Sequence, residues 1–324
     1  MRFPTDIAEI ASRPGELRAG GTDLSERRRS GRSRGPLVDL RDLPGLGAIE
    51  LVDGGLRVGA KVTIAALAAH ASVPAGLAQA AGGLATPQIR AVATVAGNLS
   101  QRVRCWYFRN PEFSCLQSGG TSCLARDGDH LYHSCFDDQA CVAPHPSTLA
   151  CALLAYDATV EVAEAPGAGQ VAHGAGAPAA GQAPLLPLAG VLASLQAAHF
   201  GRGQPPMIVA LRVPTPAAGE RAAYVRAIAR ARAEWPLAEV VVRLSVVDGL
   251  VTAARVVVGG VATVPIRREA VEAALVGGAP DEGRIAAAAA LASEGARPLP
   301  MTGYKLPILV GAVREALERA AGAS

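Results

Sequence analysis

The feature that most constrains this chain lies between residues 85 and 157, where a turn of small residues runs directly into a cluster of cysteines. The turn spans Thr94 to Asn98, and its Ala96 and Gly97 carry almost no side chain, so the backbone can approach a ligand closely. A ligand cradle therefore leads into a group of thiols. All the cysteines of the chain follow this turn: Cys105, Cys115, Cys123, Cys135, Cys141 and Cys151.

The redox state of the cellular compartment determines whether these thiols are expected to form disulfide bonds or to bind a metal. The N-terminal segment lacks a continuous apolar region and a small-residue cleavage site, and no run of about 18 apolar residues follows, so neither a secretory signal nor a membrane span is expected. We expect a cytoplasmic protein, exported only if a partner carries it. In a reducing compartment, metal ligation explains six cysteines better than disulfide bonds do.

The cysteine spacings leave the kind of metal site open. Nine residues separate Cys105 from Cys115, seven separate Cys115 from Cys123, and seventeen separate Cys123 from Cys141. The absence of a C-x-x-C pair disfavours zinc ribbons and fingers. Thiolates also bind iron-sulfur clusters, and a cubane cluster needs four of them in one place. Residues 101 to 144 are rich in Gly, Ser, Asp and Asn, which is typical of an irregular lobe.

Two cysteines and two histidines remain after four thiols are assigned. Cys151 lies in an apolar helical run, where a buried core cysteine is expected. Cys135 is a spare or an alternative ligand. His133 and His145 could also bind iron, or they could be ordinary loop histidines.

The segment before the cysteines predicts strands and short helices. Gly20, Gly21 and Thr22 form a turn whose backbone N–H groups could meet an anion, although such a pair is usually an ordinary turn. Strands are predicted within 37–67, with a hairpin at residues 53–55, and one helix is predicted over 64–77. No G-x-G-x-x-G and no P-loop motif is present, so any dinucleotide requires another kind of cradle.

Five arginines lie close together between Arg27 and Arg34. They could contact phosphate or RNA, but no aromatic residues alternate with them, so a solvated helix end and loop is favoured. The formal net charge of +3 is small for 324 residues. We therefore expect no nucleic-acid partner.

The second half of the chain predicts a separate α+β domain. A helix over 146–154 and a strand over 157–163 precede a low-complexity loop at 165–187, and the strand at 207–214 still belongs to the first domain. We place the first domain at 1–216 and the second at 217–324. The second domain has three predicted strands (223–228, 237–247, 250–258), a hairpin at Asp248-Gly249, and helices over 267–276, 281–293 and 305–321.

Four segments together resemble a known family. They are AGGTDL at 19–24, PQIRAVATVAGNL at 87–99, HPSTLACALLAYDATV at 145–160 and MTGYKLPIL at 301–309. The chain resembles the flavin-binding medium subunit of the molybdenum hydroxylases, the xanthine dehydrogenase family. The cysteine insertion resembles the branch whose flavin subunit carries an additional 4Fe-4S cluster, as in 4-hydroxybenzoyl-CoA reductase and certain aldehyde oxidoreductases.

This resemblance implies a two-subdomain FAD-binding domain of the vanillyl-alcohol oxidase type. Its two pyrophosphate loops correspond to residues 20–23 and 94–98, and Cys105, Cys115, Cys123 and Cys141 correspond to the cluster ligands. The family usually has Asp at position 148, so Thr148 replaces an expected carboxylate with a hydroxyl. The full set of expected FAD-binding residues is Ala19, Gly20, Gly21, Thr22, Asp23, Leu24, Gln88, Thr94, Val95, Ala96, Gly97, Asn98, Ser147 and Thr148.

The implied function is electron transfer within a larger complex. A large subunit with a molybdenum cofactor and a small subunit with two 2Fe-2S clusters are the expected partners, and FAD exchanges electrons with an external acceptor. Two alternatives stay open: a stand-alone FAD-dependent reductase on the same fold, and a zinc-stabilised interaction scaffold. The sequence does not indicate the organic substrate, the direction of electron flow or the acceptor.

Overall fold

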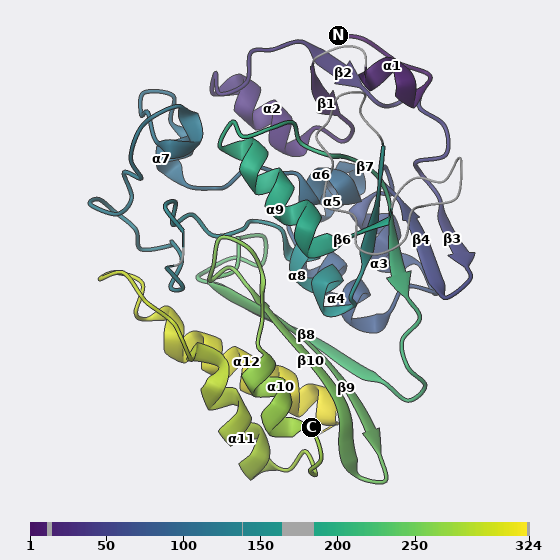
Figure 1. The fold of residues 1–324 in the computed structure, drawn as a ribbon, viewed down its shortest axis with the longest axis vertical. Helices are drawn as coiled ribbons and strands as arrows, with labels where there is room; N and C mark the ends of the chain where they lie inside the picture. Colours follow the sequence, from purple (N-terminus) through teal and green to yellow (C-terminus); the bar gives the residue numbers. More distant parts are fainter. Residues whose placement is uncertain (12–14, 138, 164–184, 323–324) are drawn as a thin grey trace.

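A computed structural model describes residues 1–11, 15–137, 139–163 and 185–322. Three sheets organise these residues, and Figure 1 shows the C-terminal sheet and its helices below the N-terminal part of the molecule. The smallest sheet pairs β1 (Glu16–Arg18) in parallel with β2 (Leu37–Asp39). Helices α1 (Ile7–Ala11) and α2 (Thr22–Arg29) accompany it.

The second sheet is antiparallel throughout and has the order β3-β4-β7-β5-β6. The predicted hairpin joins its first two strands, since Val52 pairs with Gly55 and Gly54 has a φ of 77°, which glycine adopts without strain. The strands are β3 (Ile49–Val52), β4 (Gly55–Gly59), β5 (Thr159–Ala163), β6 (Leu185–Pro187) and β7 (Met207–Pro214).

Short helices pack against this sheet and form the larger apolar core with it. Several begin at a hydroxyl side chain that accepts a hydrogen bond from the backbone, as at Thr63, Thr86, Thr94 and Ser147. The helices are α3 (Ile64–Ala69), α4 (Ala75–Gly83), α5 (Pro87–Val92), α6 (Val95–Leu99), α8 (Thr148–Ala155) and α9 (Leu188–His199).

Two predictions for this part were wrong. The single helix expected over 64–77 is two helices, because the residue before Pro74 avoids the helical conformation and Pro74 starts α4 instead. The loop expected at 165–187 falls mostly on residues 164–184, outside the described residues, but its last three residues form β6 and pair with β5. Helix α9 had no counterpart in the sequence prediction.

The C-terminal sheet has the order β11-β10-β9-β8. The three predicted strands are present, and Ile266–Arg267 adds a fourth, β11, that was not predicted. Asp248 and Gly249 both have positive φ, as their hairpin turn requires. The remaining elements are β8 (Arg221–Ala227), β9 (Ala238–Val247), β10 (Leu250–Gly259), α10 (Glu269–Leu275), α11 (Glu282–Ala290), η2 (Leu291–Ser293) and α12 (Lys305–Ala321).

Helices cover both faces of this sheet. Helices α10 and α12 contact one face, while α4 and α8 of the N-terminal part contact the other. Side chains alternate along β9, so Val240 and Val242 lie on the first face and Val241 lies on the second. Because α8 lies directly on β9 and β10, residues at its start come close to the C-terminal sheet. The domain boundary predicted after residue 216 lies between β7 and β8 and stays a prediction.

The cysteine-rich segment forms an irregular lobe between α6 and α8. Its regular elements are α7 (Trp106–Arg109) and η1 (Leu116–Ser118), and Figure 1 shows α7 at the edge of the molecule on the side of α2. The lobe has its own small apolar cluster, which includes Val103, Phe108 and Ala143. No helix in the described parts of the chain is long and apolar enough to cross a membrane.

Candidate flavin and iron-sulfur site

The first glycine loop packs directly against the segment that precedes the second loop. A Cβ atom at Gly20 would lie 1.8 Å from the carbonyl oxygen of Val92, so only glycine allows this approach. Gly21 has a φ of 68° and caps α2. The tertiary structure therefore brings together two loops that lie far apart in the sequence.

The second loop is held by its own threonine and by the start of α8. Thr94 Oγ1 accepts a hydrogen bond from Gly97 N at 3.3 Å, and Ser147 Oγ donates to Asn98 Oδ1 at 2.6 Å. Asn98 and Ser147 were both predicted to bind the cofactor, and here they orient each other.

A cavity of about 190 Å³ lies between these loops and the C-terminal domain. The C-terminal domain contributes Arg226, Trp235 and Pro236, which sequence reasoning missed because no local motif marks them. Five predicted cofactor-binding residues line it: Thr22, Asp23, Gly97, Asn98 and Thr148. The others do not: Ala19, Gly20, Gly21, Leu24, Gln88, Thr94, Val95, Ala96 and Ser147.

Two buried guanidinium nitrogens at this cavity fit a ligand rich in hydrogen-bond acceptors. The Nε atoms of Arg104 and Arg226 are buried and have no protein partner, and both side chains line the cavity. A buried donor without an acceptor costs about 1–3 kcal/mol. FAD, with its phosphates and carbonyl groups, supplies acceptors of the kind that these donors lack, so the residues present fit this cofactor.

Asp23 links the first loop to the cysteine-rich lobe. Its carboxylate accepts hydrogen bonds from Arg109 at 2.7 Å and Arg27 at 2.9 Å, and it forms an ion pair with Arg104 at 3.2 Å. Burial raises the pKa of Asp23, but the attraction of these arginines outweighs burial and leaves the pKa below its ordinary value. Asp23 is thus an ionised carboxylate whose partners come from α2 and from the cysteine-rich lobe.

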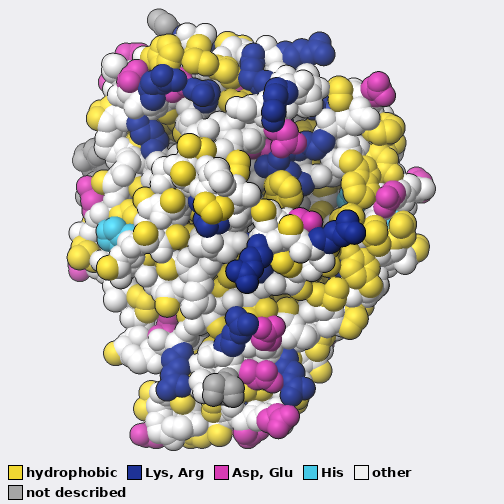
Figure 2. Space-filling view, turned by 180° about the vertical axis from the view of Figure 1, so that it is seen from behind, with side chains coloured by type: hydrophobic (Ala, Val, Ile, Leu, Met, Phe, Trp, Pro, Cys, Tyr) yellow, Lys and Arg dark blue, Asp and Glu magenta, His cyan; other side chains and the backbone are white. Residues whose placement is uncertain are grey.

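The expectation that the arginine run is solvated was wrong for two of its members. Arg27 is half-buried and also pairs with Glu16 at 2.6 Å, and Arg32 donates to the carbonyl oxygen of Phe113 at 2.6 Å in the cysteine-rich lobe. On the face seen in Figure 2, basic side chains are spread among acidic ones. Arg32 thus ties the lobe to the segment that follows α2, whereas Arg27 ties α2 to β1.

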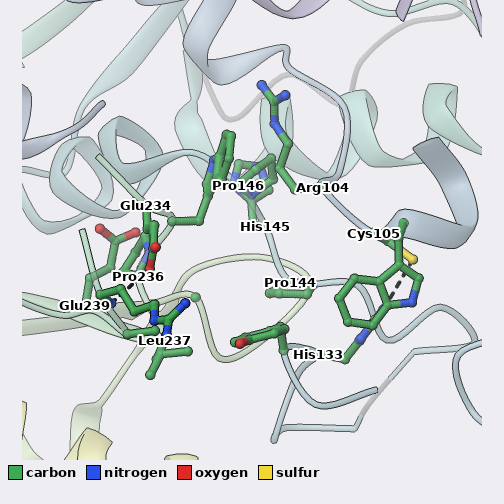
Figure 3. A pocket seen from close by; sticks show the side chains of 16 residues that line it. Arg104, Cys105, His133, Pro144, His145, Pro146, Glu234, Pro236, Leu237 and Glu239 are labelled. Atoms are coloured by element: carbon green, nitrogen blue, oxygen red, sulfur yellow. Dashed lines mark hydrogen bonds between the residues drawn. The ribbon is translucent and has the colours of Figure 1, made fainter. Parts of the chain in front are cut away.

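A second cavity, of about 290 Å³, adjoins the first and extends to the cysteine-rich lobe. Arg104, Pro146 and Trp235 line both cavities, and Arg104 lies over the Trp235 ring at 4.5 Å from its centroid. Figure 3 shows Glu234 and Glu239 on one side of the second cavity and Cys105 on the other. The two adjoining cavities together form a hollow that extends from the glycine loops to the first cysteine.

The four cysteines that correspond to cluster ligands line one small cavity of about 10 Å³. Gln117 Nε2 donates to Cys141 Sγ at 3.4 Å, and Ser118 Oγ donates to Cys115 Sγ at 3.5 Å. The hydrogen bond between Cys123 and Cys141 lowers the pKa of Cys123 and raises that of Cys141. Burial raises the pKa of Cys105 to about 11. Donors directed at sulfur stabilise thiolates, which are the metal-binding form.

His133 separates this small cavity from the larger one. Its Nε2 lies 3.2 Å from Cys105 Sγ, and burial lowers its pKa to about 4, so the ring is neutral at pH 7. Burial also lowers the pKa of His145 to about 4; its Nδ1 accepts from Ser147 N at 3.2 Å, and it does not line the cysteine cavity. Of the two candidate histidines, only His133 thus contacts a candidate cluster ligand.

The two remaining cysteines lie elsewhere. Cys151 is fully buried between α8 and β10 and contacts the carbonyl oxygen of Val257 at 3.4 Å, as expected for a core cysteine. Cys135 is buried in the C-terminal core and does not line the cysteine cavity.

No three His, Cys, Asp or Glu side chains among the described residues converge closely enough to hold a single metal ion. In a cubane cluster, by contrast, each thiolate binds a different iron.

The C-terminal motif at 301–309 anchors the lobe. Lys305 is 1% exposed, and its Nζ donates to the carbonyl oxygens of Gly260 at 2.9 Å and Tyr132 at 3.2 Å. Tyr304 adds a hydrogen bond from its hydroxyl to Leu131 O at 2.9 Å. Burial lowers the pKa of Lys305 to about 8, so it remains largely charged at pH 7.

We expect Lys305→Met to lower the free energy of unfolding by about 1–3 kcal/mol, because the carbonyl groups of Gly260 and Tyr132 lose their donor, and the bond to Gly260 is buried. Arg314→Met on the exposed side of α12 is the control and should change stability by less than about 0.5 kcal/mol. Urea unfolding at pH 7 measures both. Equal stability of the two variants would show that Lys305 does not anchor the lobe.

Comparison with known proteins shows which family the chain belongs to. Residues 8–175 match the model for the FAD binding domain in molybdopterin dehydrogenase. The chain belongs to this family. Residues 223–320 of this flavin subunit match the CO dehydrogenase flavoprotein C-terminal domain. The resemblance to the flavin-binding medium subunit is thereby confirmed, and so is the mixed α+β fold class. The resemblance to the branch with an additional 4Fe-4S cluster stays a prediction.

A curated relative covers most of the flavin subunit. The aldehyde oxidoreductase FAD-binding subunit PaoB of Escherichia coli (strain K12) is 35% identical over 295 residues, which is 86% of this chain and 85% of PaoB. The subunit is thus an FAD-containing oxidoreductase component of the molybdenum hydroxylase family.

Solved structures share the fold at lower identity. Quinoline 2-oxidoreductase from Pseudomonas putida 86 matches with a TM-score of 0.72 and 20% identity, covering 99% of this chain and 96% of that one. Carbon monoxide dehydrogenase from Hydrogenophaga pseudoflava matches with a TM-score of 0.70 and 22% identity, covering 99% and 96%.

Proposed function

We propose that this flavin subunit carries both FAD and a 4Fe-4S cluster and relays electrons between a partner's 2Fe-2S clusters and an external acceptor. The observation that carries the proposal is the hollow, formed by two adjoining cavities, that extends from the two glycine loops to Cys105. A flavin held by the glycine loops and a cluster held by the four cysteines would lie at its two ends.

The four cysteines and the hydrogen-bond donors beside them support the proposal of a 4Fe-4S cluster. Cys105, Cys115, Cys123 and Cys141 line one cavity, and side-chain donors from Gln117 and Ser118 point at two of the sulfur atoms. Such hydrogen bonds influence the reduction potential of a bound cluster. The free space between the thiols is small, so the loops that carry them must move apart when a cluster is inserted.

The residues of the chain bind and position rather than transfer protons. When bound, FAD exchanges electrons both singly and in pairs, which lets it join one-electron and two-electron carriers. The glycine loops supply closely approaching backbone, Arg104 and Arg226 supply donors, and Trp106 and His133 lie between the larger cavity and the cysteines. We retain the full set of fourteen predicted FAD-binding residues as the proposed site.

The proposed partners are a large molybdenum-cofactor subunit and a small 2Fe-2S subunit, and the proposed location is the cytoplasm. PaoB, named as a subunit of an aldehyde oxidoreductase, supports assembly with other chains. The comparisons do not favour a stand-alone FAD-dependent reductase or a zinc scaffold. An isolated two-electron reductase also has no need for a one-electron relay.

The test is to purify the chain anaerobically with the products of its neighbouring genes and to measure flavin and iron per chain. We expect one FAD, a broad iron-sulfur absorbance, and about four irons bound by this subunit after it is separated from the 2Fe-2S subunit. Flavin without iron would overturn the cluster and leave the FAD subunit. A colourless protein that purifies alone would overturn the whole proposal.

A further inference from the structure

Glu239 is a buried carboxylate that the electron relay does not use. It is 1% exposed, and no Lys, Arg or His among the described residues forms an ion pair with it. Burial raises the pKa of Glu239 above its ordinary value. Because an unpaired buried carboxyl group is costly, its presence requires an explanation beyond packing.

The register of β9 places this carboxyl group at the boundary between the two domains. Glu239 is the second residue of β9 and shares a strand face with Val241, which packs toward α8. It lies opposite Gly259 of β10, where a Cβ atom would come within 2.8 Å of Glu239 Oε1. The glycine leaves room for the side chain.

Two hydroxyl groups hold one of its oxygens. Thr148 Oγ1 and Tyr224 OH each donate to Glu239 Oε2 at 2.8 Å. No described side chain forms a hydrogen bond to Oε1, and Glu239 lines the larger cavity. Thr148 lines the adjoining cavity between the glycine loops. The carboxyl group is therefore fixed through one oxygen, while the side chain borders the hollow (Figure 3).

We propose that Glu239 is a flavin-contacting residue, carried into the site by the C-terminal domain and held there by Thr148. Its partner is a hydrogen-bond donor of the flavin, such as a sugar-like hydroxyl or a ring N–H group. The carboxylate that Thr148 lacks is thus supplied by a strand 91 residues further along the chain. This inference rests on FAD binding by the proposed function, but not on the iron-sulfur cluster.

The experiment is a titration of FAD into the flavin-depleted full-length chain, followed by flavin fluorescence and visible absorbance. Glu239→Gln should raise the Kd for FAD about tenfold or more, as expected when a charge-assisted hydrogen bond is lost. It should also shift the absorbance bands of the bound flavin. Tyr156→Phe is the matched control: it removes a buried hydroxyl group that accepts a hydrogen bond from Gly76 N, and Tyr156 lines neither cavity. It should lower the Tm but change the Kd less than threefold.

Moving the carboxylate from position 239 to position 148 distinguishes a role in FAD binding from a role in domain packing. Thr148→Asp alone places two carboxyl groups side by side and should weaken FAD binding. Combined with Glu239→Gln, it restores a single carboxylate at the neighbouring position and should return the Kd to within about threefold of the wild-type value.

Three outcomes decide between the possibilities. If Glu239→Gln lowers the Tm while the Kd and the spectrum stay unchanged, Glu239 only joins the domains and the proposal is overturned. If the double variant binds no better than Glu239→Gln, the exchange between positions 148 and 239 is overturned. A wild-type chain that binds no FAD would instead contradict the proposed function itself.

Discussion

Replacing Cys141 with alanine is expected to abolish iron binding by this subunit, from about four irons per chain to nearly none. Cys141 contacts Cys123 and Gln117, and all four candidate ligands surround one cavity, so the loss of one sulfur leaves an incomplete ligand set. Iron content and the electron paramagnetic resonance spectrum of the reduced protein measure the effect. Cys141→Ser keeps the shape of the side chain and should lose iron as well.

Cys135→Ala is the matched control for this change. Cys135 is another buried cysteine of the same segment, but it packs into the C-terminal core rather than the cysteine cavity. We expect Cys135→Ala to retain full iron content. If Cys135→Ala loses iron and Cys141→Ala keeps it, the proposed ligand set is wrong. If both variants keep four irons, the cluster is not held in this cavity.

Replacing Gly20 with alanine is expected to prevent stable FAD binding and to destabilise the fold by about 1–3 kcal/mol or more. The added methyl group would lie 1.8 Å from Val92 O and 2.7 Å from the carbonyl carbon, and a backbone atom cannot move aside as a flexible side chain can. The two glycine loops must then separate, which opens the cavity between them. Flavin content after purification and urea unfolding report the two effects.

Gly82→Ala provides the control for the glycine substitution. Gly82 lies within α4, and its nearest neighbour for a Cβ atom is Ala68 at 3.9 Å, an ordinary contact. Alanine favours the helix by about 1 kcal/mol over glycine, so this variant should keep its flavin and gain stability. A Gly20→Ala variant that behaves like Gly82→Ala would show that close approach of the loops is not required.

Local chemistry made much of the fold predictable. The Asp53-Gly54 and Asp248-Gly249 pairs mark hairpins because their residues adopt positive φ readily, and both hairpins are present. The alternating apolar run along 237–247 forms β9 almost as predicted. Helix ends were predicted less well: the 64–77 helix is interrupted before Pro74, where a local backbone preference overrides the apolar periodicity.

The roles of these arginines depend on contacts with residues that lie elsewhere in the sequence. Arg27 and Arg32 lie in a run that looks solvated, yet one pairs with Glu16 and the other reaches the carbonyl oxygen of Phe113, 81 residues away. The charge of a side chain is visible in the sequence, but its partner is not. The ion pair forms when α2 packs beside β1, and the hydrogen bond forms when the lobe packs beside the end of α2.

The sequence by itself determined that a cradle of small residues precedes a set of thiols, because side-chain size and sulfur chemistry are local properties. Only the tertiary structure decided which groups meet: Gly20 against Val92, Thr148 against Glu239, and Lys305 against the loop at Tyr132. Each of these contacts joins residues from distant parts of the chain. Long-range packing brings them together, and that packing depends on the whole fold rather than on any single segment.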